Sequence, residues 1–320
     1  MSAVGQPAGR VSGLHRRLRY APFLCQLVVT RRCNLACGYC SEYDAVSGPV
    51  PADELRRRID HVARLGSFGL EFTGGEPLLH PDLVALVRHA RPHRFRMLGL
   101  ISNGFLLTRD IVEALNDAGL TDLQISVDGV RPNVVTLKAL QPLRPKLELL
   151  ARHARFRVVL SAVVGSGASG DEVEEVVRFA RDRGFRPRVL LLHDAGGQLG
   201  LSLADLASYR RVQRLIGRHW KDWFDYRDAL IGAGRAPFRC RAGSRYLYVG
   251  EQGLAHRCAQ TRLAFGKPLA EYSFADLRTQ YHSSKPCNEC CTIGCARSCS
   301  MPDRWFPQRQ EDGEARAHRP

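Results

Sequence analysis

The sequence predicts an α/β fold built on a parallel β-sheet. Between about residues 22 and 220, short apolar segments alternate with amphipathic, helix-like segments. The apolar segments are rich in Val, Ile and Leu and mostly apolar on both faces, as parallel strands covered on both sides are. Six strand–helix units follow one another, and such repeats form parallel sheets with right-handed crossovers. An open doubly wound sheet and an incomplete barrel both satisfy this pattern.

The expected elements follow from local signals. Strands are predicted over residues 23–29, 69–72, 97–101, 122–127, 157–164 and 188–192, and helices over 51–65, 81–90, 108–118, 171–183 and 202–220. The segment 132–153 is expected to be helical only in its second half, because Pro142 and Pro145 interrupt it. No G-x-G-x-x-G follows the first strand, which disfavours a dinucleotide-binding domain.

Composition limits the possible partners. The 47 Lys and Arg residues exceed the 32 Asp and Glu residues, giving a formal charge of +15. A basic surface could meet nucleic acid or an anionic substrate, but no basic block interleaves with aromatic residues, so we do not expect a nucleic-acid partner. No apolar run is long enough to cross a bilayer, and the N-terminal segment lacks the apolar stretch of a secretion signal. We therefore expect a cytoplasmic protein without a membrane partner.

The chain divides by composition into five expected segments. They are a disordered basic leader (1–21), the strand–helix core (22–220), a connector (221–239), a small Cys-rich domain (240–302) and a flexible tail (303–320). Within the Cys-rich domain, a strand pair is predicted at 244–249 and 253–257, joined by a turn. Because the segment before the first strand is short, we expect no peptide-binding domain there.

Ten of the eleven cysteines lie in two groups, and only Cys25 falls in a predicted core strand. A secreted disulfide scaffold would be shorter and would spread its cysteines, so the grouping indicates metal ligation. The first group, TRRCNLACGYC, places Cys33, Cys37 and Cys40 in the loop after the first strand, at the end of a parallel fold where active sites lie. Three thiolates can bind a cubane cluster and leave one iron open for a ligand. A zinc site with a distant fourth ligand is the alternative.

This C-x3-C-x2-C spacing, with the aromatic Tyr39 before the last cysteine, resembles the motif of the radical S-adenosylmethionine (SAM) superfamily. Three further landmarks of that family follow successive strands: GGEP at 74–77, Ser-Asn-Gly at 102–104 and Ser-Val-Asp-Gly at 126–129. Each alone could be an ordinary turn. Their joint placement behind the three-cysteine loop carries the resemblance.

The resemblance implies a partial (βα)6 TIM-like barrel. It implies that Cys33, Cys37 and Cys40 are the catalytic ligands of a 4Fe–4S cluster that cleaves SAM to a 5′-deoxyadenosyl radical, with a one-electron donor such as flavodoxin or ferredoxin as partner. The implied SAM-binding residues are Tyr39, Gly74, Gly75, Glu76, Pro77, Ser102, Asn103, Ser126 and Asp128.

The second cysteine group resembles the SPASM/Twitch extensions that carry auxiliary 4Fe–4S clusters. Cys240, Gly253 and Cys258 match the spacing of the first element, whereas the second element has one residue fewer than the family pattern, no final cysteine and an extra Cys291. One interpretation is a single cluster with Cys291, Cys295 and Cys299 spare, and the other is two clusters, one incompletely ligated. A zinc ribbon also fits the spacing. The candidate metal ligands are Cys240, Cys258, Cys287, Cys290, Cys295 and Cys299.

We therefore expect an iron–sulfur oxidoreductase or transferase that abstracts hydrogen from an unactivated carbon of a small-molecule or peptide substrate, leading to oxidation, epimerisation or cross-linking. The rival hypotheses are a zinc-stabilised nucleic-acid-binding protein and an electron carrier without SAM chemistry. His193 and Asp194 follow the sixth strand and could contact substrate. An aromatic group at 220–226 is expected to pack the two domains together.

Overall fold

The structure is a computed structural model of the chain, and it describes residues 18–40, 43–193, 199–216, 230–232, 234–236, 238–289 and 291–301. Most of the predicted leader and the whole of the predicted tail lie outside the described residues, as do most of the connector, Asp194 and Cys290. The aromatic group at 220–226 also lies outside them.

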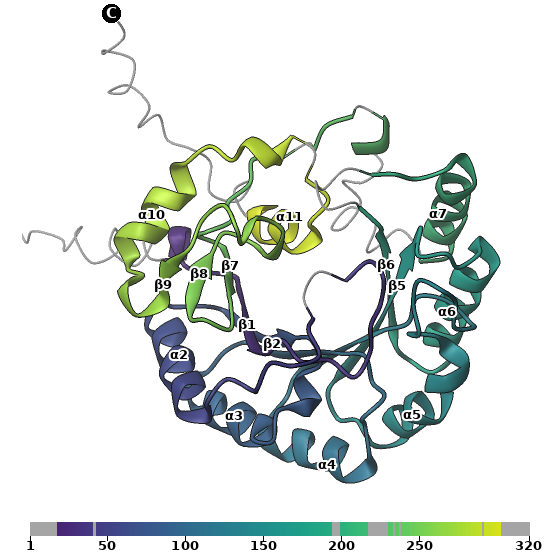
Figure 1. Cartoon of the computed structure of the whole chain (residues 1–320), viewed down its shortest axis with the longest axis horizontal. Helices are drawn as coiled ribbons and strands as arrows, with labels where there is room; N and C mark the ends of the chain where they lie inside the picture. The colour runs from purple at the N-terminus through teal and green to yellow at the C-terminus, as the bar shows by residue number, and fades with distance from the viewer. Residues whose placement is uncertain are drawn as a thin grey trace, which may run out of the picture.

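The predicted parallel sheet is present. Its strands are β1 (Leu24–Thr30), β2 (Gly69–Gly74), β3 (Met97–Ser102), β4 (Asp122–Ser126), β5 (Arg157–Val164) and β6 (Arg186–Leu191). Each pairs in parallel with the next along the chain. Figure 1 shows the sheet curving around a concave interior, with helices on its outer side and an opening between the two ends. The α/β prediction is therefore confirmed as a partial barrel.

Six helices cover the outer face of this sheet: α2 (Ala52–Arg64), α3 (Leu83–Ala90), α4 (Arg109–Ala118), α5 (Leu140–His153), α6 (Gly170–Asp182) and α7 (Leu203–Ile216). Their apolar sides form one core with the outward side chains of the strands, such as Leu27 and Phe72. Residues 217–220, predicted as the end of the last helix, lie outside the described part of the chain. No helix among the described residues is long and apolar enough to span a membrane.

The helix in 132–153 is confined to the later part of the segment, as expected, but the prolines are not the reason. Helix α5 begins at Leu140 and contains both Pro142 and Pro145. Pro142 lies in the first turn, where a backbone N–H has no intrahelical acceptor, so it removes no hydrogen bond. Pro145 removes one, but the helix buries Leu143 and Leu147 on its inner face, and this packing maintains the helix.

The C-terminal segment extends the barrel sheet. Strand β7 (Tyr246–Val249) pairs in parallel with β1, and β8 (Leu254–His256) and β9 (Lys267–Pro268) follow antiparallel. The strand order is β6-β5-β4-β3-β2-β1-β7-β8-β9. Helices α10 (Phe274–His282) and α11 (Gly294–Ser300) complete this region, and short 3-10 turns lie at Pro77–Leu79, Arg91–His93, Ala259–Thr261, Leu269–Glu271 and Pro286–Asn288. The strand pair was predicted, but its attachment to β1 was not.

The concave face of the sheet is polar, unlike the expected strands with two apolar faces. Gln26 on β1 donates from Nε2 to Glu71 Oε2 on β2 at 2.7 Å. Arg188 on β6 donates from Nη1 to Gln124 Oε1 on β4 at 2.7 Å. Successive strand residues point to opposite faces, so these side chains lie opposite the helix-facing core. The partial barrel therefore encloses a surface suited to a polar ligand.

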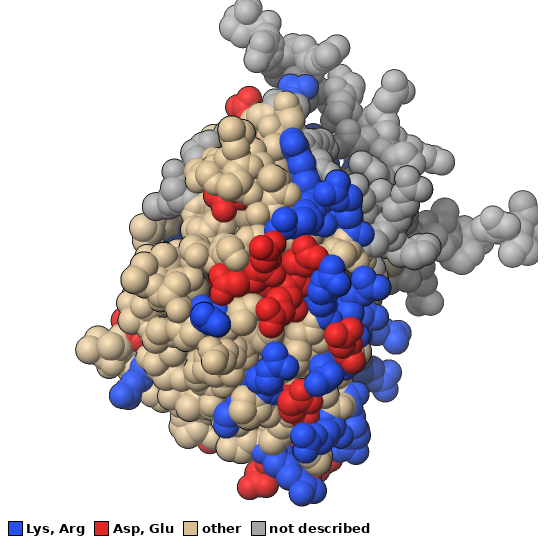
Figure 2. Space-filling view, turned by 90° about the vertical axis from the view of Figure 1, so that its right-hand side faces the viewer, with Lys and Arg blue, Asp and Glu red and all other residues tan. Residues whose placement is uncertain are grey.

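Surface charges on the face formed by α5, α6 and α7 are mixed. Figure 2 shows acidic side chains gathered near the centre of this face, with Lys and Arg around them. Arg211 pairs with Asp171 at 2.6 Å, and Arg183 on the same side pairs with Glu148 at 2.7 Å. The excess of basic residues in the sequence thus forms no uninterrupted basic surface on this face.

Candidate functional site

The two glycines of the GGEP motif bring the end of β2 against the end of β1. The Gly75 N–H donates to Thr30 O at 2.9 Å, and the Glu76 N–H donates to Arg32 O at 2.9 Å. A Cβ at Gly75 would lie 2.3 Å from Arg31 O, and one at Gly74 would lie 2.0 Å from Thr30 O. Any larger residue would collide with this backbone. The close approach that these glycines permit is therefore to the segment just before Cys33.

Glu76 links the second and third landmarks. Its side chain is 0% exposed. Oε1 accepts hydrogen bonds from the Leu78 N–H at 3.0 Å and the Ser102 hydroxyl at 2.8 Å, and Oε2 accepts from the Asn103 N–H at 2.7 Å. Burial raises the pKa of Glu76, while these donors act in the opposite direction. Pro77 follows it at the start of the 3-10 turn Pro77–Leu79. The SAM contact expected of Glu76 stays a prediction.

Asn103 connects the third landmark to the cysteine loop. Its Nδ2 donates to Asn34 Oδ1 at 2.7 Å and lies 3.7 Å from Cys33 Sγ. The Leu35 N–H donates to the same sulfur at 3.4 Å. Burial raises the pKa of Cys33, and the Leu35 N–H opposes this rise. Hydrogen bonds to sulfur are among the interactions by which proteins tune iron–sulfur clusters.

Asp128, from the fourth landmark, receives two hydroxyl groups. Tyr39 donates to its Oδ2 at 2.5 Å, and Thr136 donates to the same atom at 2.8 Å. Asp128 is 0% exposed, and its Oδ1 has no hydrogen-bond partner in the described part of the protein. Ser126 ends β4, where it lies beside Ser161 of β5. The unpartnered oxygen of Asp128 is suited to accept a hydrogen bond from a ligand.

Lys138 and Thr136 are two polar residues of this site that the sequence analysis missed. Lys138 Nζ lies 4.9 Å from the centre of the Tyr39 ring, and Thr136 Oγ1 lies 3.6 Å from Cys37 Sγ. Burial acts to lower the pKa of Lys138, but the neighbouring Tyr39, Asp128 and Cys37 raise it overall. Their position in the sequence could have indicated both residues, because they lie in the loop after the fourth strand, at the same edge of the sheet as the family motifs.

The described cysteine sulfurs are spaced more widely than the ligand atoms of a preformed zinc site. Tetrahedral zinc with sulfur ligands at about 2.3 Å needs sulfur–sulfur distances of roughly 3.8 Å. In the described part of the chain, one group of His, Cys, Asp or Glu residues has three ligand atoms within 4.8 Å of one another: Asp60, His89 and His93. No three of the described cysteines form such a group. A cubane cluster binds each thiolate at a different iron corner and therefore fits wider spacing better.

Comparison with known proteins assigns the family. Residues 27–193, more than half of the chain, match the family described as the Radical SAM superfamily. The chain belongs to the radical SAM superfamily. Members of this superfamily use a 4Fe–4S cluster and SAM, so this part of the cofactor prediction is confirmed. The match runs from the middle of β1 to just beyond β6 and includes all four predicted motifs.

Two curated relatives of this radical SAM protein differ in what they act on. It is 32% identical over 244 residues to GTP 3′,8-cyclase of Synechococcus sp. (strain CC9902), covering 70% of each protein. It is 40% identical over 111 residues to PqqA peptide cyclase of Rhodopseudomonas palustris (strain ATCC BAA-98 / CGA009), covering 34% of this chain and 29% of that protein.

The radical SAM fold is also evident from a solved structure. Streptococcus suis SuiB bound to S-adenosylmethionine matches with a TM-score of 0.63 and 15% identity, covering 88% of this chain and 71% of SuiB. At this level of identity the likeness establishes the fold alone. The match nevertheless extends well beyond residues 27–193, because it covers 88% of the chain.

Four cysteines of the C-terminal region of this radical SAM protein lie near one another. Burial raises the pKa of Cys240 to about 11, and Cys258 and Cys287 contribute to the rise. Burial also raises the pKa of Cys291, and Cys240, Cys258 and Cys287 add to that effect. The expectation that Cys291 is spare therefore has a structural alternative, in which it is the fourth member of this group. Cys290 lies outside the described residues.

Cys295 and Cys299 lie on α11 and face the barrel interior. Cys295 Sγ is 4.0 Å from Gln26 Nε2. Burial raises the pKa of Cys299, and both Cys295 and Glu71 contribute. Tyr246 on β7 also donates to Gln26 Oε1. These two cysteines are thus placed between the other C-terminal cysteines and the polar concave face.

Proposed function

We propose that this protein reductively cleaves SAM at a 4Fe–4S cluster held by Cys33, Cys37 and Cys40, and that the 5′-deoxyadenosyl radical abstracts hydrogen from a substrate at the concave face. The observation that carries the proposal is the convergence of Glu76, Asn103 and Asp128 on the three-cysteine loop. The cluster and SAM together supply the radical chemistry when bound.

The protein's own part in this reaction is binding and positioning. Asn103 and the Leu35 N–H lie against Cys33 and would stabilise its thiolate. Glu76 holds the turns after β2 and β3 at fixed separation. Asp128 orients Tyr39 and keeps Oδ1 available for a polar contact with SAM, the role that the family resemblance implies.

The substrate class that we propose is a polar small molecule or a peptide side chain. The concave face carries both signs of charge, from Glu71 and Arg188, together with Gln26 and Gln124. Such a surface favours a ligand with its own hydrogen-bonding groups, because buried polar groups need partners. Relatives named for GTP and for the peptide PqqA are consistent with either class. Oxidation, epimerisation and cross-linking are the candidate outcomes, with flavodoxin or ferredoxin as electron donor in the cytoplasm.

We further propose that the 240–302 segment is a SPASM/Twitch-like domain with at least one auxiliary 4Fe–4S cluster. Its ligands would be Cys240, Cys258 and Cys287, with Cys291 or Cys290 as the fourth. The influence of Cys240, Cys258 and Cys287 on the pKa of Cys291 favours Cys291. A fully reconstituted protein with only about four irons per chain would contradict an auxiliary cluster.

The decisive experiment measures 5′-deoxyadenosine formation from SAM after anaerobic reconstitution and reduction. Replacing Cys33, Cys37 and Cys40 by Ala should abolish product and remove the SAM-induced change in the electron paramagnetic resonance (EPR) spectrum of the reduced cluster. The matched control is Cys25→Ala, since Cys25 is buried on the helix-facing side of β1. Persistent cleavage in the triple variant would refute the site.

A further inference from the structure

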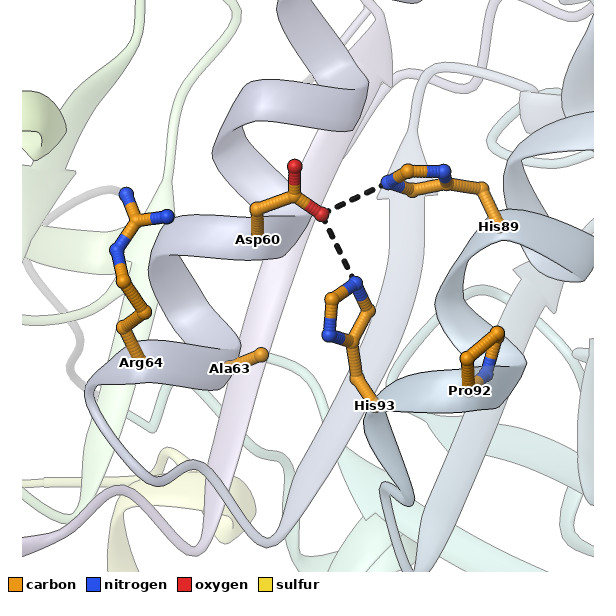
Figure 3. Close-up of a pocket in the computed structure, with 6 residues that line it drawn as sticks. All are labelled: Asp60, Ala63, Arg64, His89, Pro92 and His93. Atoms are coloured by element: carbon orange, nitrogen blue, oxygen red, sulfur yellow. Dashed lines mark hydrogen bonds and ion pairs between the residues drawn. The ribbon is translucent and has the colours of Figure 1, made fainter.

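Three side chains on the outer face of the barrel converge on one point. His89 Nε2 and His93 Nε2 each lie 2.8 Å from Asp60 Oδ1 (Figure 3). The three ligand atoms all lie within 4.8 Å of one another. They border a surface hollow of about 620 Å³, which Ala63, Arg64 and Pro92 also line.

Local structure explains why these rings meet the carboxylate. On α2, Ile59 is buried in the core, whereas the next residue, Asp60, is partly exposed. Asp60 therefore lies on the side of the helix that borders solvent. His89 is in the last turn of α3, and Pro92 is the middle residue of the 3-10 turn Arg91–His93 that follows. Arg94 then adopts a left-handed conformation with φ of 60°, which is rare for a residue other than glycine and turns the chain towards β3. His93 is therefore held beside His89 and not on a continuing helix.

The three groups are accessible to a cation from solvent. Arg64 lines the same hollow, yet its Nη2 bonds to His61 Nδ1 at 3.2 Å, and Figure 3 shows its guanidinium turned away from the triad. The side chains of Asp60, His89 and His93 are 36%, 31% and 29% exposed, so solvent can supply further ligands.

We propose that Asp60, His89 and His93 form a binding site for a divalent transition-metal ion, for which Zn²⁺ is the best match. Two imidazole nitrogens, one carboxylate oxygen and a water complete a tetrahedral zinc shell. Both imidazoles would be neutral, with the proton on Nδ1 and the Nε2 lone pair on the metal. Imidazole ligands favour zinc and transition metals such as copper and nickel over Mg²⁺ and Ca²⁺.

The position of the site makes its role structural. Helices α2 and α3 each begin near the carboxyl ends of the strands and run back, so their later turns lie towards the opposite edge of the sheet from Cys33. Asp60 and His89 are both in the second halves of their helices. A bound ion would cross-link α2 to the α3 region without contacting the radical chemistry, and this inference does not rest on the proposed function.

The test uses the cluster-loaded protein under anaerobic conditions. It is equilibrated with Zn²⁺, dialysed against a weak chelator, and its metals are counted by mass spectrometry. We expect the wild type to retain about one zinc per chain more than the H89Q/H93Q variant, and zinc to raise the midpoint of thermal unfolding only in the wild type. H153Q, which changes a partly exposed histidine in the last turn of α5, should behave as the wild type.

Zinc X-ray absorption separates this site from cysteine-bound zinc. A zinc shell of nitrogen and oxygen atoms alone would support the proposal, provided that D60N and H89Q/H93Q both lose this bound zinc. Equal zinc retention in wild type and H89Q/H93Q, or sulfur scattering in the wild type, would overturn it. SAM cleavage should be unchanged in these variants, so failure of this site and failure of the proposed function are distinguishable.

Discussion

At the scale of single residues, Glu76 shows how one buried carboxylate can organise a site. Both of its oxygens receive only donors, from Leu78, Ser102 and Asn103. An amide at this position would turn an N–H₂ group towards at least one N–H donor. The residue therefore holds the turns of two landmarks together whether or not a ligand is bound.

We expect Glu76→Gln to destabilise the fold by about 1–3 kcal/mol, the cost of leaving buried polar groups unsatisfied. SAM affinity should fall as well, because the turn after β3 loses its anchor. Chemical denaturation and SAM titration measure the two effects. Glu113→Gln on exposed α4, where Glu113 pairs with Arg109, is the control. Equal stability of the two variants would contradict this account of Glu76.

Lys138 is the second residue with a specific prediction. It places a buried cation beside Tyr39, Asp128 and Cys37. The reduction potential of an iron–sulfur cluster depends on nearby charge, so loss of a cation should make reduction harder. We expect Lys138→Met to shift the cluster potential to more negative values and to slow SAM cleavage, whereas Lys138→Arg should retain most of both.

Redox titration followed by EPR measures that shift. Lys146→Met is the matched control, because Lys146 lies on α5 and donates to Leu107 O, which belongs to none of the four motifs. An unchanged potential in Lys138→Met would mean that Lys138 serves packing and not electrostatics.

At the scale of secondary-structure elements, the start of α6 links a helix cap to the active-site edge. Ser169 and Glu172 form a capping box. Glu172 Oε1 also accepts from the N–H groups of Val130 and Arg131, at 3.3 and 3.2 Å. One carboxylate thus anchors both the helix and the loop that follows Asp128.

Glu172→Gln should lower stability by about 1 kcal/mol at neutral pH. Desolvation acts to raise the pKa of Glu172, but hydrogen bonds from Ser169, Arg131 and Val130 lower it overall. A folded-state pKa below the unfolded value gives stability that is present above the unfolded pKa and lost as pH falls through the folded one. The difference between variant and wild type should therefore shrink in the acid range below about pH 4.3, as denaturation at several pH values can show. A constant difference would contradict this linkage.

At the scale of the whole molecule, β7 makes the C-terminal segment part of the barrel sheet. Strand β1 is buried along its whole length and lies between β2 and β7. Removing β7 would leave β1 as an unprotected apolar edge, which promotes aggregation. The predicted domain boundaries at 220 and 240 stay a prediction, but the region beyond them contributes directly to the sheet.

A chain ending at residue 220 should accordingly lose most of its soluble yield compared with the full chain. It lacks β7, Tyr246 and the contact from Tyr246 to Gln26. Soluble fraction and size-exclusion chromatography provide the measurement. A monodisperse, folded product of this truncation would show that the six-stranded barrel is independent of the C-terminal region.

The sequence by itself determined the features that depend on neighbours along the chain. Periodicity placed all six core strands and most helices, and cysteine spacing located the 33–40 loop. An error of the sequence analysis was local as well. Pro142 and Pro145 have low helix propensity, but the burial of leucines on α5 stabilises the helix by more than the prolines destabilise it. Such patterns are readable because strand alternation, helical turns and ligand spacing are set within a few residues.

Only the tertiary structure decided which distant segments meet. It placed β7 beside β1, Lys138 beside Tyr39, Cys291 near Cys240, and Asp60 between two histidines of a neighbouring helix and turn. Apart from Cys240 and Cys291, which belong to one cysteine group in the sequence, none of these pairs shares a spacing or motif, because each contact forms only when the closed sheet and its helices bring the segments together. The physical reason is that packing of the whole core selects non-local contacts, whereas local sequence selects only the elements that make them.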